Sequence, residues 1–489
     1  MLFTEPTFLF LFLPLLLGLY AACHRSDGAA NLLLLVASVI FYAKGGGNFT
    51  WLMLASMAFN YRMAIVVDRA RMTGGATRML TLAVVVNLAV LGIFKYANFF
   101  AGNLNAIGAL AGQGPVAFPN VVLPIGISFY TFHAISYVVD VYRRDASAQK
   151  SPVHAALYLL LFPQLIAGPI IRYRDIADQL AHRLFRLDDF AWGVRRFVIG
   201  LGKKVLIANQ VAEVADRIFG MPAAQLSPGH AWLGIVCYTL QIYFDFSGYS
   251  DMAIGLGRMF GFRFPENFRW PYIADTVQEF WRRWHMSLSS WFRDYVYVPL
   301  GGSRVSPRRT YVNLVAIFFF CGLWHGASWN FVIWGLFHGA FLVLERLGPG
   351  RAVRSAPRPL RHAYVLLVVM IGWVFFRAET LTGALTYLAA LAGHAASAPT
   401  PFTVGWYLTP AISLAITAGV VGSFPIGPAV SRWQDRGLTV SGHGSGADTI
   451  APASVRMAVL NAGLVAVVLV AAIVQIAART YNPFIYFRF

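Results

Sequence analysis

The sequence predicts an all-α polytopic membrane protein. Hydrophobic residues make up 58% of the 489 residues and charged residues only 12%, whereas ordinary soluble domains contain about 25% charged residues. Apolar runs recur along the whole chain, and the loops between them carry most of the charge. We expect about 11 to 13 membrane segments, several of them re-entrant or interfacial. They form one domain over residues 1–489, with core motifs in 121–345 and further spans in 362–489.

The distribution of charge predicts the orientation in the membrane. The 39 basic and 21 acidic residues give a net charge of +18, which in a soluble protein would suggest a nucleic-acid partner. Here the basic residues lie in loops, as the positive-inside rule describes, so we expect membrane lipid and no nucleic acid as a partner. The rule places Asp68–Arg78 and Arg143–Lys150 in the cytoplasm, and Asn98–Asn120, which lacks Lys and Arg, outside. The N-terminus is then extracytoplasmic.

The N-terminal third has the pattern of regular membrane spans. Phe8–Ala22 is apolar, but Glu5 precedes it and no Lys or Arg does, so we expect a first span rather than a cleaved signal peptide. The next apolar runs predict further helices over Asn31–Ala43, Phe49–Val67, Met79–Tyr96 and Val121–Val141.

The following segments are less regular. His154–Ile171 is apolar, but prolines and Gly168 interrupt it and basic residues flank it, which predicts a re-entrant segment. Phe190–Asp216 has a helical period but contains several cations. We expect its first half to lie in the cytoplasmic interface with these cations snorkelling to water. They are Arg195, Arg196, Lys203 and Lys204.

A span over Ala231–Gly257 leads into the strongly basic stretch Arg258–Arg309. Within that stretch, apolar side chains recur at helical spacing and predict one amphipathic helix that lies in, or dips into, the cytoplasmic interface. These side chains are Trp281, Trp284, Leu288 and Trp291.

The apolar run Tyr311–Leu344 contains no acidic or basic residue but two histidines, His325 and His338. It is longer than the roughly 20 residues of one helical span and shorter than two full spans. Either one long helix is tilted, or the chain breaks near Gly322 and Gly326, where the backbone must be buried in protein or face water. Both alternatives put His325 in an unusual environment.

The C-terminal part begins with Arg346–Arg361, which is basic and therefore predicted to be cytoplasmic. A cytoplasmic loop with Arg432 and Arg436 precedes the last span. The expected membrane segments of this part are His362–Phe376, Leu381–Leu391, Trp406–Gly422 and Val455–Ala478.

His325 is the first candidate for chemistry, because ionisable side chains at bilayer depth are costly and usually functional. A neutral imidazole can remove a hydroxyl proton, although a core histidine bonded to a neighbouring helix is the alternative. His285 alone is typical of an interfacial histidine, but beside His325 it could orient or assist the base. Neither has the HxxH or HExxH spacing of metal ligands, so we predict no metal. His338 would point away from His325 on a continuous helix, which favours a packing role.

Asp245 and Asp251 are the second group of candidates. Carboxylates in a span could relay protons or bind cations in a transporter. Six residues apart, they do not meet on a helix unless it breaks at Gly248, and we prefer salt bridges to cytoplasmic arginines.

The chain resembles the membrane-bound O-acyltransferase family, in its bacterial branch of alginate O-acetyltransferases, through five co-linear stretches. A D-alanine-transferring protein of teichoic acid synthesis looks like a relative. The resemblance extends to the closing FIYFRF (484–489) and is weakest in Gly350–Arg361 and Ala395–Ser454. The stretches are LPIGISFYTFHAISYVVDVYR (123–143), FPQLIAGPIIRY (162–173), YFDFSGYSDMAIGLGRMFGF (243–262), WRRWHMSLSSWFRDYVYVPLGG (281–302) and CGLWHGASWNFVIWGLFHG (321–339).

The resemblance implies a fold and a site. The expected fold is a ring of helices around a thinned centre, with a funnel that reaches the histidine. The family histidine in Trp-His-Gly matches His325, which is thereby implied to be catalytic, and a second family position matches His285. The further residues that we expect to bind substrate are Trp324, Trp281, Arg282, Asp245 and Ser247.

The resemblance also implies a reaction. The donor would be acetyl-CoA or a similar acyl thioester that approaches from the cytoplasm as a substrate, with no bound cofactor, and the basic stretch 258–309 suits its anionic groups. The acceptor hydroxyl would belong to an extracytoplasmic partner protein, which then esterifies a polysaccharide of the alginate type. The expected location is the bacterial inner membrane. D-alanyl or peptidoglycan O-acyl transfer, a transporter without bond chemistry and a structural subunit of an export complex remain alternatives.

Overall fold

The computed structural model describes residues 1–394, 398–426, 452–478 and 481–483, and every regular element in these ranges is helical. This confirms the predicted fold class. Five helices of the described part are long and apolar enough to cross a membrane, judged by length and composition. They are Asp27–Gly46, Phe49–Thr73, Ala76–Leu110, Arg358–Arg377 and Val459–Ala478, and shorter apolar helices are Phe8–Cys23, Leu381–Leu391 and Pro410–Gly422.

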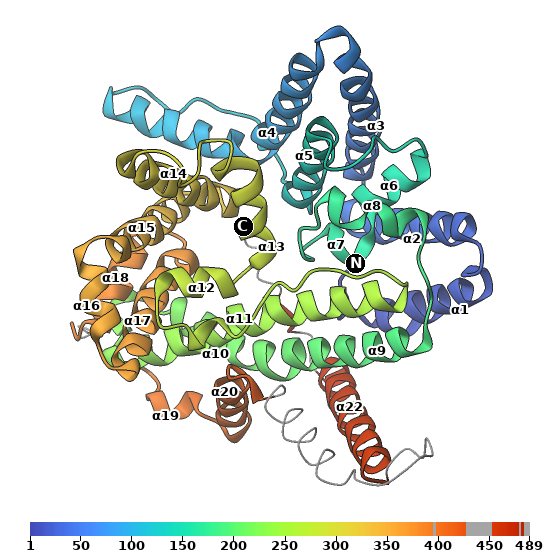
Figure 1. Cartoon of the computed structure of the whole chain (residues 1–489). Coiled ribbons are helices and arrows are strands. Elements are labelled where there is room, and N and C mark those ends of the chain that lie inside the picture. Colours follow the sequence, from blue (N-terminus) through green and yellow to red (C-terminus); the bar gives the residue numbers. More distant parts are fainter. Residues whose placement is uncertain (395–397, 427–451, 479–480, 484–489) are drawn as a thin grey trace.

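The N-terminal helices pack as a group on one side of the molecule (Figure 1). Ser26 caps the second helix by accepting a hydrogen bond from the backbone N–H of Ala29 at 3.4 Å. Inside the group, Asn60 and Asn87 exchange side-chain hydrogen bonds of 3.0 and 2.7 Å between two helices. The helices are α1 (Leu13–Cys23), preceded by a π-helical turn (Phe8–Phe12), α2 (Asp27–Gly46), α3 (Phe49–Arg69), α4 (Ala76–Leu110) and α5 (Ile127–Arg143).

The segment expected to be re-entrant is interrupted, as predicted. It forms the short helices α6 (Pro152–Leu160) and α7 (Phe162–Leu165), and α8 (Tyr173–Ala181) follows. Residues from Ala155 to Ile171 are buried in the protein, so the irregular backbone is covered by packed side chains.

Two long helical segments, α9 and α11, run side by side below the centre of the view in Figure 1. Glycines allow their close approach, because a Cβ on Gly200 would lie 2.7 Å from the backbone nitrogen of Met252. The expected snorkelling is wrong for Arg196, Lys203 and Lys204, since carboxylates of α11 offer them partners inside the protein. The elements are α9 (Leu187–Gly202), a π-helical turn (Lys203–Ala208), α10 (Asn209–Phe219) and α11 (Pro228–Met259).

The predicted single amphipathic helix is also wrong. The chain forms two short helices, α12 (Val277–Arg283) and α13 (Met286–Phe292), because His285 adopts a left-handed conformation with φ of 44°. The tryptophans and leucine of the predicted apolar face are buried in both helices and between them, so this face packs inside the protein. Figure 1 shows α13 between the N-terminal group and the helices from α14 (Pro307–His325) to α18 (Leu381–Leu391).

The remaining described helices complete the other side of the molecule, and α22 projects from its lower edge (Figure 1). The predicted loop with Arg432 and Arg436 and the closing stretch 484–489 lie outside the described residues. The helices are α14 (Pro307–His325), α15 (Trp329–Arg346), α16 (Gly348–Ser355), α17 (Arg358–Arg377), α18 (Leu381–Leu391), α19 (Val404–Tyr407), α20 (Pro410–Gly422) and α22 (Pro452–Ala478).

Candidate active site

His325 is the last residue of α14, and the extended Gly326 ends the helix. Of the two alternatives for the apolar run, the break is therefore correct, and it lies at 326–328 rather than at Gly322. The hairpin of α14 and α15 is tight because glycines face each other. A Cβ on Gly322 would collide with the carbonyl of Phe331, and one on Gly335 with the carbonyl of Phe318. The small residues of the run thus fix where His325 lies.

His285 lies between α12 and α13, and a buried asparagine holds it there. The backbone N–H of Met286 donates to the carbonyl of Asn267 at 2.9 Å. The Ser287 backbone N–H and hydroxyl donate to Oδ1 of Asn267 at 3.2 and 2.9 Å. Nδ2 of Asn267 donates to Ser250 of α11 at 3.0 Å. Sequence reasoning missed Asn267, because a polar residue between Glu266 and Phe268 in a polar loop carries no distinctive signal.

Glu345 of α15 holds the N-terminal end of α12, the helix that precedes His285. Its carboxylate accepts hydrogen bonds from the backbone N–H groups of Val277 at 2.6 Å and Gln278 at 3.0 Å. These N–H groups open α12 and have no partner within the helix, and a negative charge is favourable at a helix N-terminus. The two histidine-bearing segments are therefore tied together through α15.

Aromatic rings bring the two histidines together. The imidazole of His325 lies 4.9 Å from the Trp324 ring and 5.0 Å from the Trp334 ring, between ring centroids. His285 contacts Phe246 of α11 at 4.6 Å and Trp324 at 6.1 Å. Trp324 thus touches both imidazoles, and three residues predicted for the site form one cluster.

The ring nitrogens of this cluster lack ordinary partners. Within the described part of the chain, Nδ1 of His325, both nitrogens of His285 and Nε1 of Trp324 are buried without a hydrogen-bond partner. Most buried polar atoms in proteins are hydrogen-bonded, because leaving one unpaired costs about 1–3 kcal/mol. These N–H groups and lone pairs are therefore free to engage a ligand.

Two cavities reach the cluster. The first, about 160 Å³, ends at Trp324 and His325. The second, about 210 Å³, is lined mainly by apolar side chains and includes His285. Trp324 lines the first cavity and contacts the histidine of the second, so this indole stands between them.

The predicted binding residues separate into two groups. Trp281 and Arg282 line the second cavity together with the exposed Arg346. Asp245 and Ser247 are buried in α11 and are not among the described residues that line either cavity.

The carboxylates of α11 are held in ion pairs. Asp245 pairs with Lys204 at 2.5 Å, while Asp251 pairs with Arg196 at 2.6 Å and with Lys203 at 2.7 Å. The preference for salt bridges is thus confirmed, although Asp245 takes a lysine. Helix α11 continues through Gly248, so the two carboxylates do not form a pair of their own.

His338 is buried on α15 between aromatic rings, as its predicted packing role requires, but the geometric reason given for it is wrong. Because the chain reverses after His325, the two histidines lie on different helices, and both contact the ring of Trp334, at 5.0 and 5.3 Å between ring centroids. His338 is not among the described residues that line the two cavities. Among the described residues no three His, Cys, Asp or Glu side chains gather as a metal site.

Comparison with known proteins identifies the family. Residues 75–388 match the family model described as MBOAT, the membrane-bound O-acyltransferase family. The chain belongs to this family. It is a multi-pass membrane protein and an O-acyltransferase, as the resemblance implied.

Several curated relatives are similar over most of their length. A probable alginate O-acetylase AlgI of Azotobacter vinelandii is 51% identical over 80% of this chain and 78% of its own. The probable alginate O-acetylase AlgI of Pseudomonas putida is 42% identical over the whole of both chains. A peptidoglycan O-acetyltransferase of Helicobacter pylori is 36% identical over 80% of each chain.

Proposed function

We propose that this O-acyltransferase takes an acetyl group from a cytoplasmic thioester and passes it across the inner membrane for O-acetylation of a polysaccharide. The observation that carries the proposal is the contact of His285 and His325 with one tryptophan between two cavities. Such a site can receive a donor from one side and an acceptor from the other. The similarity to proteins described as alginate O-acetylases favours an alginate-like exopolysaccharide.

His325 serves as the general base in this proposal. Its imidazole takes the proton of the acceptor hydroxyl while the hydroxyl oxygen attacks the carbonyl carbon of the thioester. A C–O bond forms, the C–S bond then breaks, and the departing thiolate receives the proton from the imidazolium. The products are one ester and one free thiol.

The negative charge that develops on the carbonyl oxygen needs a donor. His285 and Nε1 of Trp324 supply N–H groups that are buried and have no partner among the described residues. Preorganised donors of this kind contribute strongly because no water has to reorganise.

The second cavity suits the thioester donor. Its walls are largely apolar, with His285 among them, and the exposed Arg282 and Arg346 also line it. Guanidinium groups bind phosphate with paired hydrogen bonds, so an acyl thioester with a phosphate-bearing carrier, such as acetyl-CoA, fits these walls.

The first cavity suits the acceptor. Lys95 lines it and precedes, along α4, the stretch 98–120 that the positive-inside rule assigns to the outside. A hydroxyl of an extracytoplasmic partner protein would enter here and carry the acetyl group to the polymer. The same rule puts the N-terminus outside.

Peptidoglycan O-acetylation by the same chemistry is the second candidate, because the Helicobacter pylori relative covers 80% of this chain. D-alanyl transfer has less support, since the teichoic acid D-alanyltransferase of Bacillus subtilis covers only 46% of it. A transporter is disfavoured, because the carboxylates that suggested it are held in ion pairs.

The decisive experiment follows label from acetyl-CoA into polymer in membrane vesicles that contain the full chain and its extracytoplasmic partners. We expect His325→Ala to reduce transfer to background at unchanged abundance and thermal stability. His338→Phe, which replaces a neighbouring buried imidazole by a ring, is the matched control and retains transfer. Undiminished acetylation in a well-folded His325→Ala protein would refute the assignment.

A further inference from the structure

Lys95 of α4 takes no part in the chemical steps proposed above. It is half-buried and lines the first cavity with Trp324 and His325. Within the described residues no carboxylate lies within ion-pair distance of its ammonium group; its hydrogen-bond partners are the carbonyl oxygens of Trp324 and His325, the latter at 3.5 Å, and the hydroxyl of Ser128 at 3.4 Å. A cation at this depth requires a structural or functional reason.

The partners of Lys95 and its neighbour Tyr96 lie at the end of α14. A helix leaves its last four carbonyl groups without intrahelical donors. The hydroxyl of Tyr96 donates to the carbonyl of Leu323 at 2.8 Å. Lys95 donates to the carbonyl of Trp324 and, more weakly, to that of His325. Two consecutive residues of α4 therefore satisfy the carbonyls of the turn that carries His325.

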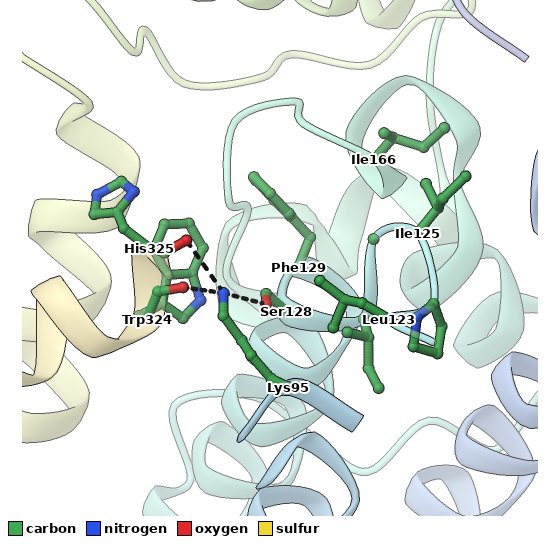
Figure 2. A pocket seen from close by; sticks show the side chains of 11 residues that line it. Lys95, Leu123, Ile125, Ser128, Phe129, Ile166, Trp324 and His325 are labelled. Atoms are coloured by element: carbon green, nitrogen blue, oxygen red, sulfur yellow. Dashed lines mark hydrogen bonds between the residues drawn. The ribbon is translucent and has the colours of Figure 1, made fainter. Parts of the chain in front are cut away.

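The charge of Lys95 also suits this position. The C-terminus of a helix carries a partial negative charge, and a nearby cation stabilises it. Figure 2 shows the carbonyl oxygens of Trp324 and His325 turned toward Lys95, while the imidazole of His325 points away from it. Lys95 thus donates its hydrogen bonds to the backbone of the turn and not to the imidazole.

We propose that Lys95 and Tyr96 are positioning residues that fix the last turn of α14 and, through it, the imidazole of His325. The inference rests on the proposed role of His325 as the base. The turn needs such support because the chain leaves the helix directly after His325, in the extended Gly326. Without donors from α4, the carbonyl groups of this turn would lack partners and the end of the helix would fray. The imidazole of His325 would then sample a wider range of orientations.

The inference predicts how kinetic constants change. Lys95→Met lowers kcat by on the order of 10²-fold, because small misplacements of a catalytic group are that costly. Tyr96→Phe removes one neutral hydrogen bond and lowers kcat about fivefold. The KM for acetyl-CoA stays unchanged in both, since the second cavity is untouched. The double variant loses less than the product of the two effects, because both residues hold one turn.

The test restores the ammonium group chemically. In Lys95→Cys, alkylation with 2-bromoethylamine forms a side chain with sulfur in place of Cγ and the amine at the lysine position. We measure label transfer from acetyl-CoA in vesicles before and after alkylation, with mass spectrometry to verify the modification. The native Cys23, Cys237 and Cys321 are controlled by alkylating the unchanged protein, and the exposed Lys150→Cys is the matched control.

We expect Lys95→Cys to lose activity at unchanged thermal stability and to regain most of it on alkylation, while Lys150→Cys is active throughout. Full activity without alkylation, or verified alkylation without recovery, overturns the inference. A raised KM in Lys95→Met with a silent Tyr96→Phe also overturns it, because Lys95 would then contact substrate. His325→Ala in the same assay separates this failure from failure of the proposed function: an active His325→Ala refutes the base itself.

Discussion

The histidine cluster and the ion pairs between α9 and α11 are two buried polar regions built on opposite rules. Where α9 and the π-helical turn after it face α11, cations pair with carboxylates, as Arg196 and Lys203 do with Asp251 at 2.6 and 2.7 Å. In the histidine cluster, the ring nitrogens of His285 and Nδ1 of His325 have no partner within the described chain. The first region satisfies its polar groups, and the second leaves them open.

The difference supports the histidine cluster as the site of the proposed reaction. A buried polar group without a partner is costly and is retained where a ligand completes it. The absence of a partner is not sufficient by itself. Both nitrogens of His133 are also buried without a partner among the described residues, but His133 is not among the residues that line the two cavities. An unpaired group beside a cavity is therefore the stronger indication.

The largest expected effect comes from the second histidine. If His285 stabilises the developing oxyanion, His285→Ala lowers kcat by about 10²–10³-fold, as the loss of one such donor does. The KM for acetyl-CoA changes little, because the interaction strengthens only in the transition state. The measurement is label transfer from acetyl-CoA at saturating donor.

His133→Ala is the control for this comparison. It removes another buried, unpaired imidazole outside the two cavities, so we expect a lower unfolding temperature and an unchanged kcat. Equal losses of kcat in both variants would show that burial, and not the position beside a cavity, determines the effect.

The sequence singled out His325, the base of the proposed reaction, for a physical reason. An imidazole in an apolar run between glycines is conspicuous, and the glycines that suggested a break do allow the tight hairpin of α14 and α15. Local sequence could also suggest the cavity-lining residues that lie near His325 or His285 along the chain, namely Trp324, Trp281 and Arg282.

Contacts between distant segments were beyond the same reasoning. The spacing of Trp281, Trp284 and Leu288 fits one helix, and only the fold shows that Asn267 holds a break at His285. Lys95 is 229 residues from Trp324 along the chain, so periodicity in either segment carries no information about their contact. Local spacing specifies helices, whereas capping across helices depends on the packed structure.

A substitution at Asp251 tests the ion-pair region. Asp251→Asn removes the carboxylate charge shared by Arg196 and Lys203 and leaves Lys203 without a charged partner in the described structure. Arg196 keeps Glu266 at 2.7 Å, which limits the loss to about 1–3 kcal/mol. We expect a lower thermal unfolding temperature, while the folded fraction transfers acyl groups at the normal kcat.

Asp178→Asn, at an exposed position of α8, is the matched control and leaves the unfolding temperature unchanged. If Asp251→Asn instead abolished kcat at normal stability, the carboxylate would belong to the chemistry, and the contrast between the two regions would be lost.

The smallest expected effect concerns Arg282 and Arg346, two cations that, unlike Arg196 of α9, have no carboxylate partner among the described residues. No ion pair of Arg282 or Arg346 occurs among the described residues, and both line the second cavity. If they bind the phosphates of the donor, Arg282→Gln with Arg346→Gln raises the KM for acetyl-CoA about tenfold, equivalent to about 1.4 kcal/mol, and leaves kcat unchanged.

A thioester without phosphate, S-acetyl-N-acetylcysteamine, distinguishes binding of phosphate from the shape of the cavity: its KM stays the same in the double variant. Arg304→Gln, an exposed change in the same basic stretch, leaves both values unchanged. Equal KM increases for the two thioesters would mean that these arginines shape the cavity rather than bind phosphate.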